Sequence, residues 1–493
     1  MKTKGSVTLF ISLLMAVILG VFQVLFQSLR IAGGRVQAEA GVEEGLYSVF
    51  SDYNRELFDR YRVFFLDGGY GSGEFSPGIM ISIVEDSLKQ SCFAGKRGNL
   101  WNCSYETAAI TGYTLATDQQ GRPFREQAVG YMKDTLGIQG IQLLADQLKQ
   151  QKKTAEEQEI QGGYENAREA QDEYEKKKEE KQRQDEEDRK HGDVSAANAG
   201  ESGTSQVEVP DDFQNPLDII RQVQKMGLLG LVVPADMPIS QETISLEEQP
   251  SRRSLKNGIG VPAVQAESSA MDDLLFLQYM VEILGCYGEE KTENGLRYQL
   301  EYVIGGKHSD QENLKKTVQE LLAVRTAANM VHLLTDSVKQ TQVHQMAVII
   351  ASAVALPFLE GIISLALQGA WAFGESVLDI RCLLKGGNVP LVKSSESWKL
   401  SLENLGNILE VLNQEEGKEK AGMDYQEYLR LLLFMKGSQS RLDRTIDLAE
   451  QEMRAGGQEN FRMDLCVYAL EAEMEIQCED QKFLIMRSYG YGM

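Results

Sequence analysis

The chain opens with an apolar stretch unlike anything that follows it. Residues 7–26 read VTLFISLLMAVILGVFQVLF and carry no formal charge, while Lys2 and Lys4 precede them. At about 1.5 Å per residue, a helix of about twenty residues spans the hydrocarbon core of a bilayer, which is roughly 30 Å thick. Lipid offers the backbone no hydrogen-bond partners, so a spanning segment must be helical. The pattern predicts a membrane anchor over residues 1–30.

A cleaved signal peptide is the alternative for this segment, because a basic start and an apolar run fit both. The small-residue site at Ala38-Glu39-Ala40 lies well past Phe26, and the run is longer than a usual signal core. We therefore predict a retained anchor. Lys2 and Lys4 predict that the amino terminus stays inside and the body lies outside, and Arg30 and Arg35 on the far flank weaken this bias.

A second apolar pattern follows the paired glycines Gly33 and Gly34. Apolar residues recur there at steps of three and four, which is typical of one face of an α-helix. The pattern predicts that the helix continues to residue 57 as an amphipathic stem, and the paired glycines would permit a bend. The stripe consists of Val42, Leu46, Val49, Phe50, Tyr53 and Leu57. It is expected to pack on the chain's own body, and a partner surface is the alternative.

Short elements alternate between residues 57 and 150. The pattern predicts, in order, a strand at 61–66, a helix at 80–90, a strand at 103–116 and a helix at 125–150. The glycine-rich stretch 68–73 lacks the lysine and the following helix of a phosphate-binding loop, so it is predicted to be a turn.

A charged region follows, in which Lys, Glu, Gln and Asp dominate and apolar positions at helical steps end at Tyr174. It predicts a solvated helix over residues 149–192, supported by charge pairs one turn apart, with a dimeric coiled coil as the alternative. Residues 193–270 are predicted to be a linker, in which a short helix starts at Asn215-Pro216.

Residues 271–493 are predicted to form a C-terminal α+β region. Helices are expected at 271–287, at 310–334 after a Ser309/Glu312 capping box, and at 343–359, and residues 296–304 fit a strand or a helix end. Leu470, Ala472, Met474 and Ile476 alternate with polar residues, which predicts a half-buried antiparallel strand with a hairpin partner at 483–491. The apolar stretch 346–373 contains Pro357 and Glu360, so it is interpreted as a buried core helix, with a second membrane span as the alternative.

These elements define the expected architecture. The fold class is α+β and mainly helical, with a transmembrane helix that continues as a stem, and an outer body with small antiparallel sheets and a charged helical insertion. The predicted divisions are 1–30 (anchor), 31–148 (stem and first α+β part), 149–192 (charged helix), 193–270 (linker) and 271–493 (C-terminal region).

The net charge limits the possible binding partners, and the cysteines limit the possible disulfides. The 493 residues carry a formal net charge of -23, which argues against nucleic acid because phosphates would be repelled. The chain has six cysteines, and two pairs that are close in sequence, Cys92/Cys103 and Cys466/Cys478, are candidates for disulfides on an oxidising face. Buried thiols are the interpretation that we favour for them.

No motif for catalysis or metal binding is present. The four histidines, His191, His308, His332 and His344, form no H-E-x-x-H pattern, and the chain has no G-x-S-x-G elbow. Residues 305–309 (GGKHS) lack the first glycine and the final Ser/Thr of a phosphate-binding loop. We predict no catalytic, cofactor-binding or metal-binding residues, and no enzyme activity.

The segment Lys4-Gly5-Ser6-Val7-Thr8, with the apolar helix after it, resembles the amino-terminal segment of tight-adherence (Flp/Tad) pilus-assembly proteins of the TadE/TadG type. Those proteins are pilin-like, with a basic tip, Gly-Ser, an apolar helix that continues as an amphipathic stem, and an outer domain. The resemblance covers the chain to about residue 60. It departs at Phe10, where pilin-like precursors usually carry the Glu that accompanies cleavage after Gly5.

Three later stretches resemble an uncharacterised envelope-protein family encoded near such pilus genes. They are EYVIGGKHSDQENL (Glu301 to Leu314), ESVLDIRCLLKGGNVPLVK (Glu375 to Lys393) and MDYQEYLRLLL (Met423 to Leu433). That family has no assigned biochemical activity, so the resemblance implies no catalytic residue.

The resemblances imply a single-pass, outward-facing, pilin-like structural component of Tad-type pilus assembly. Its expected partners are the lipid bilayer and other pilin-like or pilus-assembly proteins. The alternative is a membrane-tethered envelope enzyme or sensor with a site in residues 271–493, around His332 or His344.

Overall fold

A computed structural model gives the architecture of the chain. It describes residues 4–92, 101, 103–156, 160–191, 215–234, 236–260, 269–414, 421–478 and 480–492. The chain divides into two compact units, each built from separated stretches. Unit 1 comprises Met1–Ile138, Ser245–Tyr279 and Ser438–Met493, and unit 2 comprises Gln139–Ile244 and Met280–Gly437. The predicted C-terminal region 271–493 is therefore shared between both units.

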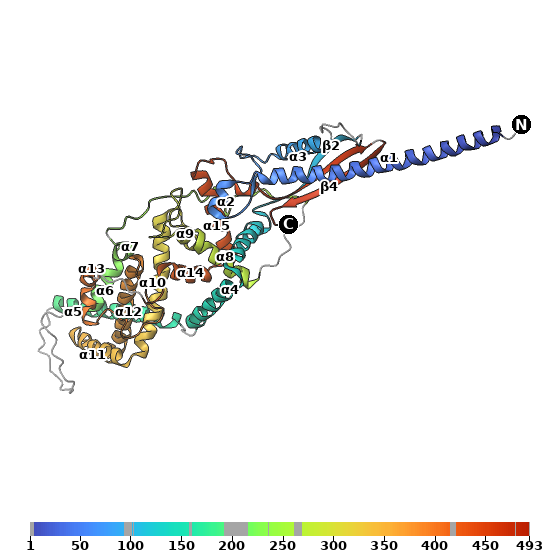
Figure 1. Ribbon diagram of the computed structural model, residues 1–493. Coiled ribbons are helices and arrows are strands. Elements are labelled where there is room, and N and C mark those ends of the chain that lie inside the picture. The colour runs from blue at the N-terminus through green and yellow to red at the C-terminus, as the bar shows by residue number, and fades with distance from the viewer. Residues whose placement is uncertain are drawn as a thin grey trace. The chain divides into compact units, whose positions relative to one another are not determined.

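Unit 1 combines a long helix with a small antiparallel sheet (Figure 1). Its helices are α1 (Lys4–Ser51), α2 (Arg55–Tyr61), α3 (Pro77–Cys92), α15 (Ser438–Ala455) and the 3-10 turn η3 (Met463–Leu465), and its strands are β1 (Leu66–Asp67), β2 (Cys103–Leu115), β3 (Cys466–Cys478) and β4 (Gln481–Gly490). Helices α4 (Asp118–Glu156) and α8 (Ala270–Ile283) contain residues of both units. Positive φ angles at Gln119, Gln120 and Gly121 show that the chain turns at the start of α4.

Strand β3 is the centre of the sheet. It pairs with β2 along its whole length, with β4 in a hairpin, and with β1 at Leu66 and Asp67, and all pairings are antiparallel. The alternating residues from Leu470 to Ile476 are buried, while the glutamates between them are only partly covered. This confirms the predicted half-buried strand and its hairpin partner. Helices α1 and α3 cover the buried face.

Two predicted elements differ from the structure. The stem helix ends at Ser51, not at residue 57, because Asn54 caps a new helix by accepting a hydrogen bond from the Leu57 backbone N–H at 3.0 Å. The predicted strand at 61–66 is also wrong, since Tyr61 ends α2 and only Leu66 and Asp67 pair in the sheet. Aromatic and branched residues gave this stretch a strand-like composition, but its side chains fill the core around Tyr61, Val63 and Phe65.

Unit 2 is helical in the part of the chain that the structure describes. Its elements are α5 (Ile160–His191), α6 (Pro216–Lys225), α7 (Leu228–Val232), α9 (Gln299–Gly305), α10 (Asp310–Thr335), α11 (Ser337–Ala353), η1 (Pro357–Leu359), α12 (Glu360–Leu384), η2 (Glu403–Asn407), α13 (Ile408–Gln414) and α14 (Tyr425–Met435). The predicted caps are present, since Ser309 Oγ accepts from the Glu312 N–H and Asn215 Oδ1 from the Leu217 N–H. The overall class, mainly helical α+β with a small antiparallel sheet, is confirmed.

Helix α12 forms the core of unit 2. It is long and apolar enough to be considered a membrane span, but 72% of its most apolar window is buried inside the unit. Pro357 separates it from α11, so the apolar run 346–373 is two helices joined at a corner. Burial on this scale fits the core-helix interpretation of that run.

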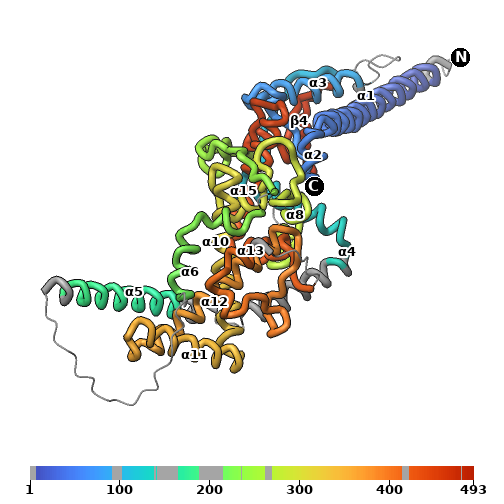
Figure 2. The backbone as a smooth tube through the Cα atoms, turned by 90° about the vertical axis from the view of Figure 1, so that its left-hand side faces the viewer, coloured from blue at the N-terminus to red at the C-terminus, as the bar shows by residue number. Residues whose placement is uncertain are grey.

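Helix α5 is less solvated than its composition predicts. Ala167, Ala170 and Tyr174 are buried, and a Cβ atom at Gly369 of α12 would lie 2.7 Å from the Ala167 Cβ, so the two helices cross closely (Figure 2). From Gln182 to Glu187 all residues are exposed. The prediction of a solvated helix therefore holds only for the second half of α5.

Candidate functional site

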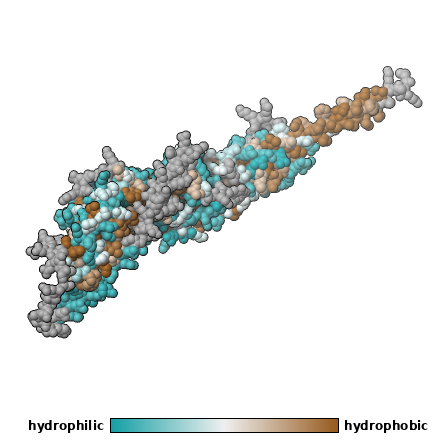
Figure 3. Space-filling model, turned by 90° about the horizontal axis from the view of Figure 1, so that it is seen from below, coloured by the Kyte–Doolittle hydropathy of each residue, from teal (hydrophilic) through white to brown (hydrophobic). Residues whose placement is uncertain are grey.

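The amino-terminal half of α1 presents apolar side chains on almost every side. All residues from Val7 to Leu29 are exposed, and large side chains such as Phe10 and Phe22 are about two-thirds exposed (Figure 3). Soluble proteins rarely expose a contiguous apolar surface of this length. The helix is long and apolar enough to span a membrane.

The other half of α1 belongs to the core of unit 1. Ala38, Val42, Leu46, Val49 and Phe50 are each at most 4% exposed and pack with buried residues of β3 and α3. Fully burying one such large apolar side chain is worth about 1.5–3 kcal/mol. The stem stripe therefore packs on the chain's own body, as the sequence predicts, and one rigid helix joins the exposed apolar surface to the core.

Glycines bring the helix close to the body. A Cβ atom at Gly45 would lie 2.8 Å from the Val84 Cα of α3, and one at Gly33 would lie 2.5 Å from the Trp101 ring. Helix α1 runs unbroken from Lys4 to Ser51 across Gly33 and Gly34. These glycines allow close approach to the body.

Strand β4 holds the stem from its other side. The Tyr491 hydroxyl, just after the strand, donates to the Phe50 carbonyl at 2.7 Å, and the Tyr489 ring meets the Tyr47 ring at 4.6 Å between centroids. Arg487 makes ion pairs with Glu39 at 2.8 Å and Glu43 at 3.1 Å. These ion pairs are solvent-accessible and contribute little to stability. The aromatic and apolar contacts therefore provide most of the stabilisation between β4 and the stem.

A disulfide joins Cys103 of β2 to Cys478 of β3, which are opposite each other in the register. The candidate pairings Cys92/Cys103 and Cys466/Cys478 are therefore wrong, and the favoured interpretation as buried thiols is wrong for Cys103 and Cys478. Cys466 is a buried free thiol, and burial raises its pKa well above the ordinary value. The Cys92 side chain lies outside the described residues. Sequence spacing misled the prediction because strand pairing brings together cysteines 375 residues apart.

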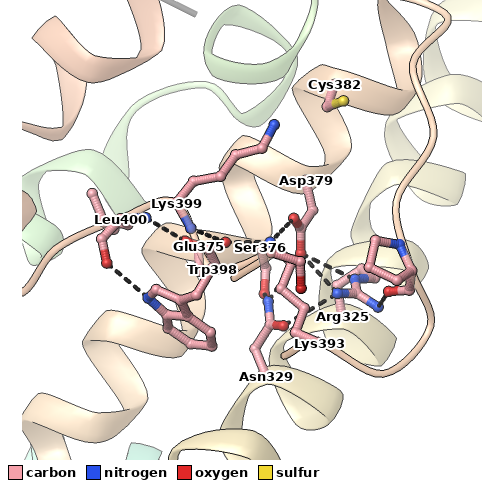
Figure 4. A network of polar contacts seen from close by, with 12 residues as sticks. Arg325, Asn329, Glu375, Ser376, Asp379, Cys382, Lys393, Trp398, Lys399 and Leu400 are labelled. Carbon is pink, nitrogen blue, oxygen red and sulfur yellow. Dashed lines mark hydrogen bonds and ion pairs between the residues drawn. The ribbon is translucent and has the colours of Figure 1, made fainter. Parts of the chain in front are cut away.

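Unit 2 contains a fully buried charge cluster that the sequence analysis missed. We call Arg325, Asn329, Glu375, Asp379 and Lys393 the Arg325 cluster (Figure 4). Arg325 donates to Asp379 Oδ2 at 2.9 Å, and Lys393 Nζ lies 2.6 Å from Asp379 Oδ1 and in contact with Glu375. Two cations thus neutralise two carboxylates. Burial alone would raise the pKa of Asp379, but Arg325 and Lys393 hold that pKa below its ordinary value.

Backbone groups complete the Arg325 cluster. The two Glu375 oxygens accept from the N–H groups of Lys399 at 3.0 Å and Leu400 at 2.7 Å, and Arg325 donates to the Leu391 carbonyl at 2.8 Å. Side chains of α10 and α12 thereby fix the irregular segment 389–400 to the helical core. The arrangement is suited to holding a fold in one geometry, because its charges are paired and shielded from water.

A second cluster surrounds Glu301 of α9, which is fully buried. Glu301 Oε1 accepts from the Tyr287 N–H and from the Tyr425 hydroxyl, both at 2.9 Å. Its Oε2 atom is buried and has no partner among the described residues. Burial raises the pKa of Glu301 to about 7, and burial likewise raises the pKa of the nearby Cys286 thiol. A thiol in that state is a poor nucleophile.

Comparison with known proteins locates both clusters within one family region. A family model described as "Family of unknown function (DUF5702)" matches residues 206–478, more than half of the chain. The chain belongs to this family. No curated protein and no solved structure matches it. The DUF5702 region includes β3 and its Cys478, while α1 and β2 lie before it.

The three stretches singled out in the sequence meet inside the DUF5702 region. Glu301 from the first stretch bonds to Tyr425 from the third. The second stretch supplies Glu375, Asp379 and Lys393, and Arg325 links Asp379 to Tyr428 of the third stretch, whose hydroxyl is 3.1 Å away. These stretches therefore contribute residues to both buried polar clusters of unit 2.

The two histidines named for an enzyme or sensor, His332 and His344, have different surroundings. His332 stacks on Trp398 with centroids 5.2 Å apart, and burial lowers its pKa. His344 is exposed and lies 3.0 Å from Glu360. A pocket of about 300 Å³ in unit 2 is lined partly by Glu175 and Arg221, which pair with each other, and by neither histidine. Among the described residues, no group of three or more metal-binding side chains is placed to hold an ion.

Proposed function

We propose that this protein is a single-pass membrane protein whose body lies outside the membrane, and that it is a pilin-like structural component of Tad-type pilus assembly. The continuity of α1 carries the proposal. Its exposed apolar half and its buried half are one helix of 48 residues, so the anchor sets the position of unit 1 directly. A flexible tether would leave the body free to move relative to the anchor, whereas a continuous helix restricts that movement.

The orientation is supported by two independent features. Lys2 and Lys4 precede the apolar segment, which favours an inside amino terminus. The Cys103–Cys478 disulfide belongs to the other end of the anchor, and disulfides persist on the oxidising side of a membrane. The assignment to pilus assembly rests on the resemblance of residues 4–60 to the TadE/TadG type of protein.

Protease accessibility tests the topology. Arg183 in the exposed half of α5 is a suitable trypsin site. We expect trypsin to cut the chain there in intact, wall-stripped cells, while a fragment with residues 7–29 resists extraction by alkaline carbonate. Cutting that occurs only after the cells are lysed would contradict the outward orientation.

Electron microscopy of surface fibres tests the pilus assignment separately. Cells that lack the chain should lose their Tad-type fibres, and the full chain should restore them. A variant with Val49→Asp and Leu46→Asp disrupts the apolar packing between the stem and the sheet. It should not restore fibres. Normal fibre numbers in cells without the chain would refute the assignment while leaving the topology intact.

A further inference from the structure

The exposed half of α1 has two different faces. Between residues 7 and 27, all the small or polar side chains recur at steps of three or four residues and therefore lie on one face. They are Thr8, Ser12, Ala16, Gly20, Gln23 and Gln27. The opposite face carries Leu14, Ile18, Val21 and Leu25. A helix that met only lipid would need no such division.

Gln23 and Gln27 are the most informative members of this face. Each amide carries two N–H donors and an acceptor oxygen. Both side chains are exposed, and neither has a hydrogen-bond partner among the described residues. Gln23 lies within the apolar span, where an unpaired amide is costly, and Gln27 lies one turn further toward the outer surface. Polar groups of one neighbouring helix can form hydrogen bonds with both amides.

The smaller residues of the face allow that neighbour to approach. Gly20 has no atom within 4 Å of the position of a Cβ. The body already uses the same side of α1 in this way, since Gly45 meets Val84 of α3 at backbone distance. Gln27 and Gly34 are seven residues apart, nearly two turns, so the polar face continues into the packed face.

We propose that a transmembrane helix of another membrane protein packs on the face formed by Ala16, Gly20, Gln23 and Gln27 and exchanges hydrogen bonds with both amides. This inference rests on the proposed insertion of α1 in the membrane and adds a partner to it. Small residues and amides are the usual means of close helix association in lipid.

The body restricts what this partner is. From Gly33 onward the same side of α1 is covered by its own unit, with Trp101 against Gly33 and the disulfide against Gly34. A second copy in parallel orientation would bring its own unit 1 to the same place, and the two would collide. The partner helix therefore belongs to a different protein and ends near the level of residue 30.

Photocrosslinking of the full chain tests the proposal. A benzophenone amino acid is placed at Ala16 or Gly20 on the polar face, and at Ile18 or Val21 on the opposite face, in the membranes of the source cells. A parallel sample contains only the purified full chain in phosphatidylcholine–phosphatidylglycerol vesicles. Carbonate extraction is performed on each variant first.

We expect the polar-face positions to crosslink to an apolar segment of a second membrane protein, at least about fivefold more than the opposite positions. Gln23→Leu with Gln27→Leu should lower that yield about fivefold, whereas Val21→Leu with Leu25→Val should not change it. Equal yields around the helix, or adducts between two copies in the purified vesicles, would overturn the inference alone. Release of the chain by carbonate would overturn the proposed anchoring as well.

Discussion

Gly34 of α1 lies directly against Cys478 of β3: a Cβ atom at Gly34 would be 2.8 Å from the Cys478 Sγ and 2.5 Å from the Cys103 Sγ. The stem helix can lie on the disulfide only because this position has no side chain. Three distant parts of the chain, α1, β2 and β3, therefore meet at the end of the sheet where the exposed half of the helix begins.

Substitution of Gly34 should loosen this junction. We expect Gly34→Ala to lower the free energy of unfolding of unit 1 by about 1–3 kcal/mol, because overpacking forces the helix and the sheet apart. Gly130→Ala in α4 is the control, since nothing lies within 4 Å of the added atom, and it should raise stability by up to about 1 kcal/mol. Denaturant titration of the full chain in detergent compares them. Equal effects of the two substitutions would show that the close approach at Gly34 is unimportant.

The disulfide should stabilise the sheet from the same place. Cys103→Ala with Cys478→Ala should lower the free energy of unfolding by about 2–5 kcal/mol, which is usual for the loss of a native disulfide. Dithiothreitol should destabilise the wild-type chain and leave the double variant unaffected. Mass spectrometry after alkylation without reductant should find both residues unmodified. If alkylation labels both thiols in the native protein, the bond and its support for the outward orientation fail together.

The elements of unit 1 were predictable where local pattern decides them. Val42, Leu46 and Val49 recur at helical spacing, and the alternation in β3 is equally regular, so both buried faces follow from period alone. The end of the stem does not, because Asn54 starts a new helix through a cap inside an apolar pattern. Asn followed by acidic residues is a cap signal that the apolar periodicity of Tyr53 and Leu57 concealed.

The buried clusters of unit 2 were not predictable from one sequence. Arg325 and Asp379 are 54 residues apart, and charged residues are ordinarily exposed, so nothing in their own helices marks them as buried. The same limit applies to Cys103 and Cys478, whose pairing depends on the register of two strands. The three stretches singled out by resemblance contain Glu301, Asp379 and Tyr428, but nothing in a single sequence says that these residues join the same buried clusters.

Removal of one charge from the Arg325 cluster should be costly. Lys393→Met leaves Glu375 and Asp379 with only Arg325 as a neutralising cation, and breaking a buried ion pair typically costs about 3–5 kcal/mol. Lys315→Met is the matched control, because Lys315 is exposed on α10, and it should change stability by less than about 0.5 kcal/mol. Trp371 and Trp398 both lie in unit 2, so their fluorescence in a Trp101→Phe background reports its unfolding. A similar small effect of both substitutions would show that the cluster is not a structural requirement.

Glu301 should make the stability of unit 2 depend on pH. Its pKa is raised from 4.5 to about 7 in the folded chain, so the folded state holds a proton that the unfolded state releases between those values. The sign follows from linkage. The contribution of Glu301 to the free energy of unfolding is largest below about pH 4.5, falls as the pH rises, and is lost above about pH 7. A shift of this size corresponds to roughly 3 kcal/mol.

The variant Glu301→Gln isolates this contribution, because its amide oxygen still accepts from Tyr425 and Tyr287 but carries no titrating proton. Between pH 5 and pH 8, the free energy of unfolding of the wild-type chain should fall by about 2–3 kcal/mol more than that of the variant. Glu396→Gln, at an exposed position of the same unit, should keep the wild-type dependence. The same fluorescence-detected denaturant titrations, repeated across this range, measure all three proteins. Parallel curves for the wild type and Glu301→Gln would mean that Glu301 is ionised in the folded state at pH 5, and that its neighbours, not its burial, determine its charge.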